Sequence, residues 1–113
     1  MTPRIPAAGD FLRVLLDRWP RAHSLDPNTA PHVQVAVRVE GDGPGFTVTL
    51  FDELIGCDGD PTQCGNVAAT VRHLFPHDAE VWIVGENAAF GKRLEPHMTA
   101  ADIMNDWEPF DLL

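Results

Sequence analysis

The sequence predicts a single α+β domain spanning residues 1–113, in which helices pack on one face of a three- to four-stranded, mostly antiparallel sheet. Three observations support this prediction. The length of 113 residues is that of one domain. Residues 32–53 alternate between apolar and other side chains with the period of a strand, and two later segments begin with helix-capping signals. The expected element order is α-β-β-α-β-α, with residues 1–7 and 108–113 as flexible ends.

The first helix is expected over residues 8–19, where Phe11, Leu15 and other apolar residues recur at helical spacing. Pro20 ends this helix, because the residue before a proline avoids the α region of backbone space. The residues that follow, 21–31, contain turn-forming Asp, Pro and Asn and are expected to form a loop.

An antiparallel hairpin over residues 32–40 and 46–53 is the clearest element. Valine occupies every second position of the first run, and Phe46, Val48 and Leu50 alternate with other residues in the second. This period of two is typical of strands with one buried face. The glycine-rich segment between the two runs favours a tight connection.

The start of the second helix is marked by Asp60, Pro61 and Gln63. Asp is a favoured N-cap, proline fits the first helical position, and glutamine three residues after the cap completes a capping box. We therefore expect a helix over residues 60–74. The residues before it, 54–59, are expected to form a loop that carries the first cysteine.

The rest of the chain supplies a third strand and a last helix. Residues 79–84 contain few polar side chains, which favours a central strand covered on both faces. Residues 85–97 are expected to form a loop, or to include a further short strand around 90–94. Thr99 begins a second capping-box pattern, so the last helix is expected over residues 99–107.

The formal net charge of −9 is concentrated in the later part of the chain, where residues 39–113 hold fourteen acidic and three basic residues. Such a field repels nucleic acid and anionic membrane surfaces, so neither is an expected partner. The alternative role of this acidity is solubility. No apolar run approaches the ~20 residues of a membrane span, and no apolar segment follows Arg4 as in a secretory signal. A cytoplasmic location is the expectation.

The C-terminal end combines aromatic and acidic side chains. Tryptophan is a frequent binding hot spot and complementary charge speeds encounter, so this end favours a basic partner protein. The alternative is that the last helix packs on the sheet and the tail folds in. The candidate partner-binding residues are Asp102, Asp106, Trp107, Glu108 and Phe110.

A weaker candidate site lies in the middle of the chain, where metal ligands or a Cys–His nucleophile pair would come from Cys57, Asp58, Asp60, Cys64, His73 and His77. The two cysteines are farther apart than the pairs of structural zinc sites, and the Ca²⁺-loop pattern is absent. Acidic surroundings also oppose a thiolate. The alternatives are two free thiols or a disulfide. No metal and no cofactor are therefore expected.

The sequence thus favours a non-enzymatic interaction module, such as an inhibitor, an immunity-type protein or an adaptor, that binds a basic partner. Two alternatives stay open. One is a small metal- or thiol-dependent enzyme with its pocket near Cys57, Cys64 and His73. The other is a structural subunit that completes its core as a homodimer, with the valine-rich hairpin pairing edge to edge.

Overall fold

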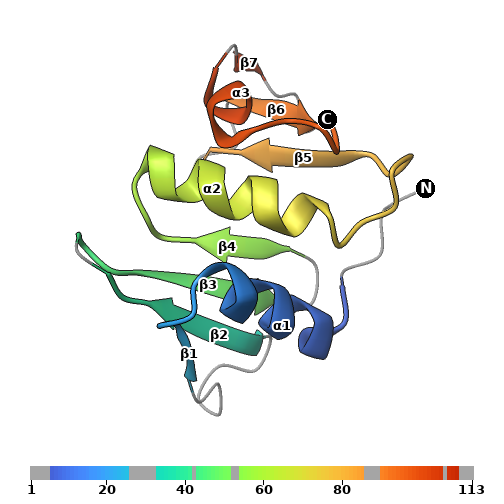
Figure 1. Ribbon diagram of the computed structural model, residues 1–113. Coiled ribbons are helices and arrows are strands. Elements are labelled where there is room, and N and C mark those ends of the chain that lie inside the picture. Colours follow the sequence, from blue (N-terminus) through green and yellow to red (C-terminus); the bar gives the residue numbers. More distant parts are fainter. Residues whose placement is uncertain are drawn as a thin grey trace.

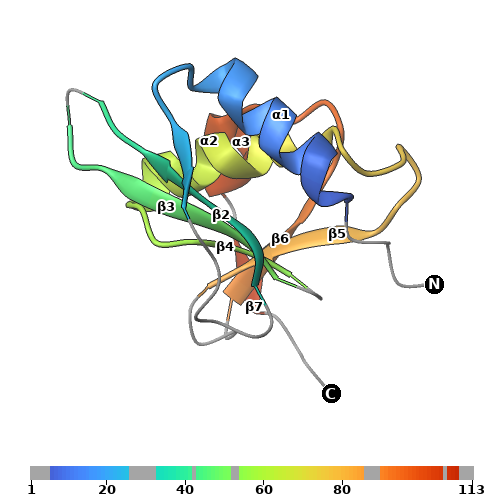
Figure 2. The same ribbon diagram turned by 90° about the horizontal axis from the view of Figure 1, so that it is seen from below.

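The computed structural model describes residues 6–25, 33–41, 43–51, 54–85, 90–105 and 107–109. The helices all lie on one side of the strands (Figure 2), so the α+β class predicted from the sequence is confirmed. The elements in chain order are α1 (Ala8–Arg18), β1 (His23–Leu25), β2 (Val33–Val39), β3 (Phe46–Phe51), β4 (Ile55–Cys57), α2 (Pro61–Arg72), β5 (Val81–Val84), β6 (Phe90–Leu94), α3 (Ala100–Met104) and β7 (Glu108–Pro109).

The expected hairpin is formed by β2 and β3, which pair antiparallel with Val37 opposite Val48. Both valines are fully buried, as the alternation predicts. The hairpin is the centre of a four-stranded antiparallel sheet in the order β1-β2-β3-β4. β1 pairs with residues 36–38 along one edge of the hairpin, and β4 pairs with residues 48–50 along the other.

The outer strands β1 and β4 lie in segments that the sequence predicted as loops. Each has three residues, too few for an alternating pattern to stand out from a loop. Their pairing is set by the neighbouring strand: Ser24 lies opposite Val37, and Cys57 lies opposite Val48. Contacts between residues that are distant in the sequence therefore determine where these two strands form.

A second antiparallel sheet has the order β5-β6-β7, so the strands form two sheets where the sequence predicted one. β6 is the short strand that was one of the two expectations for residues 85–97. β5 pairs with β6 alone among the described strands, and Val84 at its end is 40% exposed. The prediction of a central strand covered on both faces is therefore wrong, because apolar content alone does not distinguish an edge strand from a central one.

Helix α2 joins the two sheets. Its residues Val67 and Val71 pack in the larger core cluster with Phe11 and Leu15 of α1, whereas Ala68 packs in a second cluster with Leu94 and Ile103. In Figure 1, α2 crosses in front of the gap between β4 and β5, whose arrows point the same way. No hydrogen-bonded ladder joins β4 to β5 in the described part of the chain.

Both capping boxes are confirmed. In α2 the backbone N–H of Gln63 donates to Asp60 Oδ1 at 2.8 Å, and the N–H of Asp60 donates to Gln63 Oε1 at 2.9 Å. In α3 Thr99 and Asp102 make the reciprocal pair at 3.0 and 3.2 Å. α3 is shorter than expected and ends at Met104, where Asn105 turns to an extended conformation.

Candidate functional site

The first candidate partner-binding residue, Asp102, is exposed in the first turn of α3. Its carboxylate accepts a hydrogen bond from the Thr99 backbone N–H at 3.0 Å. This bond is the main cause of a lowered pKa for Asp102, to which the Thr99 hydroxyl and the charges of Lys92 and His97 also contribute. Asp102 therefore keeps its negative charge on the surface of α3, and it also belongs to the capping box of this helix.

Trp107 lies just after α3 and is half-buried. Its indole Nε1–H donates to the carbonyl oxygen of Ile103 at 2.6 Å, which holds the ring against the end of α3. The side chain thus has a structural role and keeps part of its surface accessible. Glu108 lies in β7, where its backbone pairs with Gly91 of β6. The remaining two candidates, Asp106 and Phe110, lie outside the described residues.

Two exposed apolar side chains beside this region were missed by sequence reasoning. Phe90 is 54% exposed and Val84 is 40% exposed. The strand register places Phe90 opposite Pro109 and Val84 opposite Gly91, so both lie at the same end of the second sheet as β7. Strand alternation puts Phe90 on the same face as the buried Leu94, so periodicity alone predicts that Phe90 is buried. Val84 lies opposite Gly91 and therefore points to the other face of the sheet.

We call the residues Phe90, Asp102 and Trp107 the sheet-end surface, because α3 packs on the face of the second sheet that carries Phe90 and Leu94. They come from β6, α3 and the segment that leads into β7, which lie together in Figure 1. Lys92 of β6 holds α3 in place here, because its Nζ donates to the carbonyl oxygens of Asp102 at 2.6 Å and Asn105 at 2.7 Å. The ammonium group thereby also satisfies carbonyls at the helix C-terminus.

The weaker candidate site is assembled only in part. β4 and the start of α2 bring Cys57 and Cys64 together, with both thiols free. The Sγ–H of Cys64 donates to the carbonyl oxygens of Gly59 at 3.4 Å and Cys57 at 3.7 Å. The pKa of the Cys57 thiol is raised to about 12, mainly by burial and also by its interaction with the Cys64 thiol. A thiol with such a pKa keeps its proton near neutral pH.

The other members of that set have separate places. The carboxylate of Asp58 accepts the backbone N–H of Thr47 at 2.6 Å, and Asp60 caps α2. His73 lies nine residues after Cys64, which is about 14 Å along a helix axis. Both His73 and His77 are exposed. In the part of the chain that the structure describes, no three His, Cys, Asp or Glu side chains are placed to hold a metal ion.

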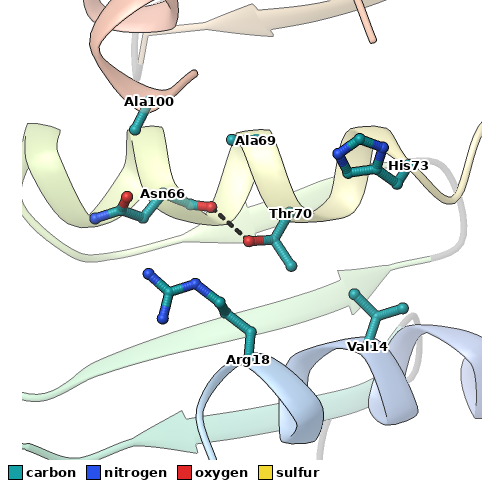
Figure 3. Close-up of a pocket in the computed structure, with 7 residues that line it drawn as sticks. All are labelled: Val14, Arg18, Asn66, Ala69, Thr70, His73 and Ala100. Atoms are coloured by element: carbon teal, nitrogen blue, oxygen red, sulfur yellow. Dashed lines mark hydrogen bonds between the residues drawn. The ribbon is translucent and has the colours of Figure 1, made fainter. Parts of the chain in front are cut away.

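A hollow of about 370 Å³ lies on the helical side of the molecule, between α1 and α2 and beside the start of α3 (Figure 3). Sequence reasoning missed this hollow, because its residues are distant in the chain and become neighbours only through helix packing. It is lined by Val14, Arg18, Asn66, Ala69, Thr70, His73 and Ala100.

Comparisons with protein-family models, with curated proteins and with solved structures find no match to this chain. Of the helices in the described ranges, none has the length and apolar character needed to cross a bilayer. The side chains and their arrangement therefore carry the functional argument.

Proposed function

We propose that this protein is a non-enzymatic interaction module that binds a basic partner protein through the sheet-end surface. The observation that carries the proposal is the exposure of Phe90 at the end of the second sheet, on the face where α3 packs and adds the charge of Asp102. A large apolar side chain with charged neighbours is the usual arrangement of a binding hot spot and its rim.

The net charge supports a basic partner. The chain carries a formal −9, and acidic residues are also dense in the sequence around β7, at positions 102, 106, 108 and 111. Complementary charge raises the rate of association and selects against acidic competitors. This contribution decreases with salt, because exposed charges are screened beyond about 8 Å at physiological ionic strength.

The apolar contribution comes from covering Phe90. About half of this residue is already buried in the free protein, so covering the rest contributes on the order of 1 kcal/mol. The half-buried Trp107 adds apolar area at the end of α3, and the bond from its indole to Ile103 fixes the ring before a partner arrives. A side chain that is ordered in advance loses less conformational entropy on binding.

The test compares capture of proteins from an extract of the source cell by the wild type, Phe90→Ala and Leu54→Ala. Leu54 is a matched control, because it is 56% exposed against 54% for Phe90 and lies between β3 and β4 on the first sheet. We expect one basic protein that is held at low salt and released at high salt. Phe90→Ala should weaken its capture, and Leu54→Ala should not. Equal capture by all three proteins would contradict the proposal.

The charge contribution is tested separately with Asp102→Asn. An asparagine oxygen still accepts the Thr99 N–H, so α3 keeps its cap while the surface loses one negative charge. We expect slower association with the captured basic protein and a weaker salt dependence, measured by surface plasmon resonance. An association rate identical to that of the wild type at low salt would show that Asp102 lies outside the interface.

A further inference from the structure

The hollow between α1 and α2 is formed by two facing rows of side chains. Asn66, Thr70 and His73 follow one another at positions i, i+4 and i+7 and so share one side of α2. Val14 and Arg18, four residues apart, share the facing side of α1. Ala69 of α2 and Ala100 of α3 complete the lining, and Figure 3 shows both on the side of α2 that faces α3.

The charge of this hollow is opposite to that of the protein as a whole. Its lining contains Arg18 and His73 and no Asp or Glu. In the described ranges, Arg13 is paired with Asp10, whereas Arg18 has no carboxylate partner. The guanidinium of Arg18 contacts the ring of Trp19, at 5.0 Å from the ring centroid. When a guanidinium lies on an aromatic face, its N–H groups point outward in the plane of the guanidinium and stay available for other acceptors.

The hydrogen-bond donors in the hollow are suited to an anion. Figure 3 shows the Arg18 side chain extending from α1 toward α2, on the same side of the hollow as Asn66. The hydroxyl of Thr70 donates to the carbonyl oxygen of Asn66 at 2.8 Å, so the proton of this hydroxyl is already used. The guanidinium of Arg18, the amide of Asn66 and the imidazole of His73 remain as donors.

We propose that this hollow binds a small organic anion, consisting of one carboxylate or phosphate group on a compact apolar body. The anionic group would accept hydrogen bonds from Arg18 and Asn66, which Figure 3 shows at the same end of the hollow, and His73 would lie at the other end. The apolar body would lie on Val14 and Ala69. The volume of about 370 Å³ falls in the usual range of small-molecule sites, about 300–1,000 Å³. The site shares no residue with the sheet-end surface and goes beyond the proposed function.

The probes are phenyl phosphate, benzoate and the uncharged phenol, each titrated into ¹⁵N-labelled protein and followed by NMR. We expect backbone amide signals of residues 14–18 and 66–73 to shift with one or both anions and not with phenol. The anion with the lower dissociation constant identifies the preferred group. Added salt should weaken the binding, because the attraction involves an exposed arginine.

Two exposed arginines of α1 provide the variant and its control. Arg18→Gln should weaken binding of the anion about tenfold, the usual loss when a hydrogen bond to a charged group is removed. Arg13→Gln should leave binding unchanged, because Arg13 lies about 140° around the helix from Arg18 and is absent from the lining. Equal responses to phenol and to the anions, unchanged binding in Arg18→Gln, or shifts confined to other elements would overturn the proposal.

Discussion

The guanidinium of Arg72 donates its Nε–H to the backbone carbonyl oxygen of Leu94 at 3.0 Å, which connects the end of α2 to β6. Arg72 is 2% exposed, and no carboxylate bonds to it in the described residues. Its two other nitrogens hold the connection between α2 and β5. They donate to the carbonyl oxygens of Phe75, Pro76, His77 and Ala79 at 3.1–3.4 Å. One side chain thus bonds to five backbone carbonyls where α2 leads into the second sheet.

Replacing Arg72 should be strongly destabilising. Arg72→Met leaves the buried carbonyls of Leu94 and Phe75 without this donor, and each costs about 1–3 kcal/mol, so we expect a loss of about 3 kcal/mol or more in the free energy of unfolding. Urea denaturation measures this. Arg93→Met is the control, because Arg93 is half-exposed and pairs with Glu95 on the surface at 3.4 Å, which is worth about 0–1 kcal/mol. Similar losses in the two variants would contradict the role assigned to Arg72.

The close packing of α3 on α2 predicts the effect of Gly65→Ala. In an exposed helix this change is favourable by about 1 kcal/mol. Here the new Cβ would lie 2.8 Å from Cγ of Met104 and 3.2 Å from the carbonyl oxygen of Ala100. We therefore expect a net destabilisation of about 1–3 kcal/mol from overpacking.

A double-mutant cycle identifies the cause of that loss. Met104→Ala removes the nearest atoms, so Gly65→Ala should be less costly in that background than in the wild type. Thermal and urea unfolding of the four proteins give the coupling energy. Additive effects would show that the contact with Met104 is not the cause of the destabilisation by Gly65→Ala.

The lowered pKa of Asp102 predicts a pH dependence. Because the folded-state pKa lies below the ordinary value of 3.8, the carboxylate stabilises the folded protein above that value. This contribution is lost as the pH falls through the folded-state pKa. Asp102→Asn should therefore reduce the acid sensitivity of unfolding, whereas the two proteins should show parallel profiles near neutral pH. An NMR titration of the Asp102 carboxyl that gives an ordinary or raised pKa would contradict this.

The Cys57 thiol should react slowly in the folded protein. A pKa raised from 9.0 to about 12 lowers the thiolate fraction roughly a thousandfold at a given lower pH. Alkylation by iodoacetamide, read by mass spectrometry, should be much slower at Cys57 in the native protein than in urea. Because the folded-state pKa of Cys57 is raised, deprotonation of this thiol destabilises the fold. Stability should therefore decrease once the pH exceeds the pKa that the thiol has in the unfolded chain. Equal rates with and without urea would show that burial does not protect this thiol.

The sequence alone determined the elements that depend on near neighbours in the chain. The alternation around Val37 and Val48 predicted the hairpin and its buried face, since the period of two is a property of the strand itself. Asp60 with Gln63, and Thr99 with Asp102, predicted both helix starts, because a capping box closes within three residues. The acidic charge and the candidates Asp102 and Trp107 were also visible at this level.

Tertiary structure decided what depends on segments far apart in the chain. The short strands β1 and β4 exist because β2 and β3 offer them partners, and the division into two sheets follows from α2 packing across their junction. The exposure of Phe90, the five bonds of Arg72 and the hollow beside Arg18 likewise depend on which surfaces meet. Local patterns specify backbone conformation and the apolar face of an element, whereas burial and pairing are collective results of packing, which a single segment does not contain.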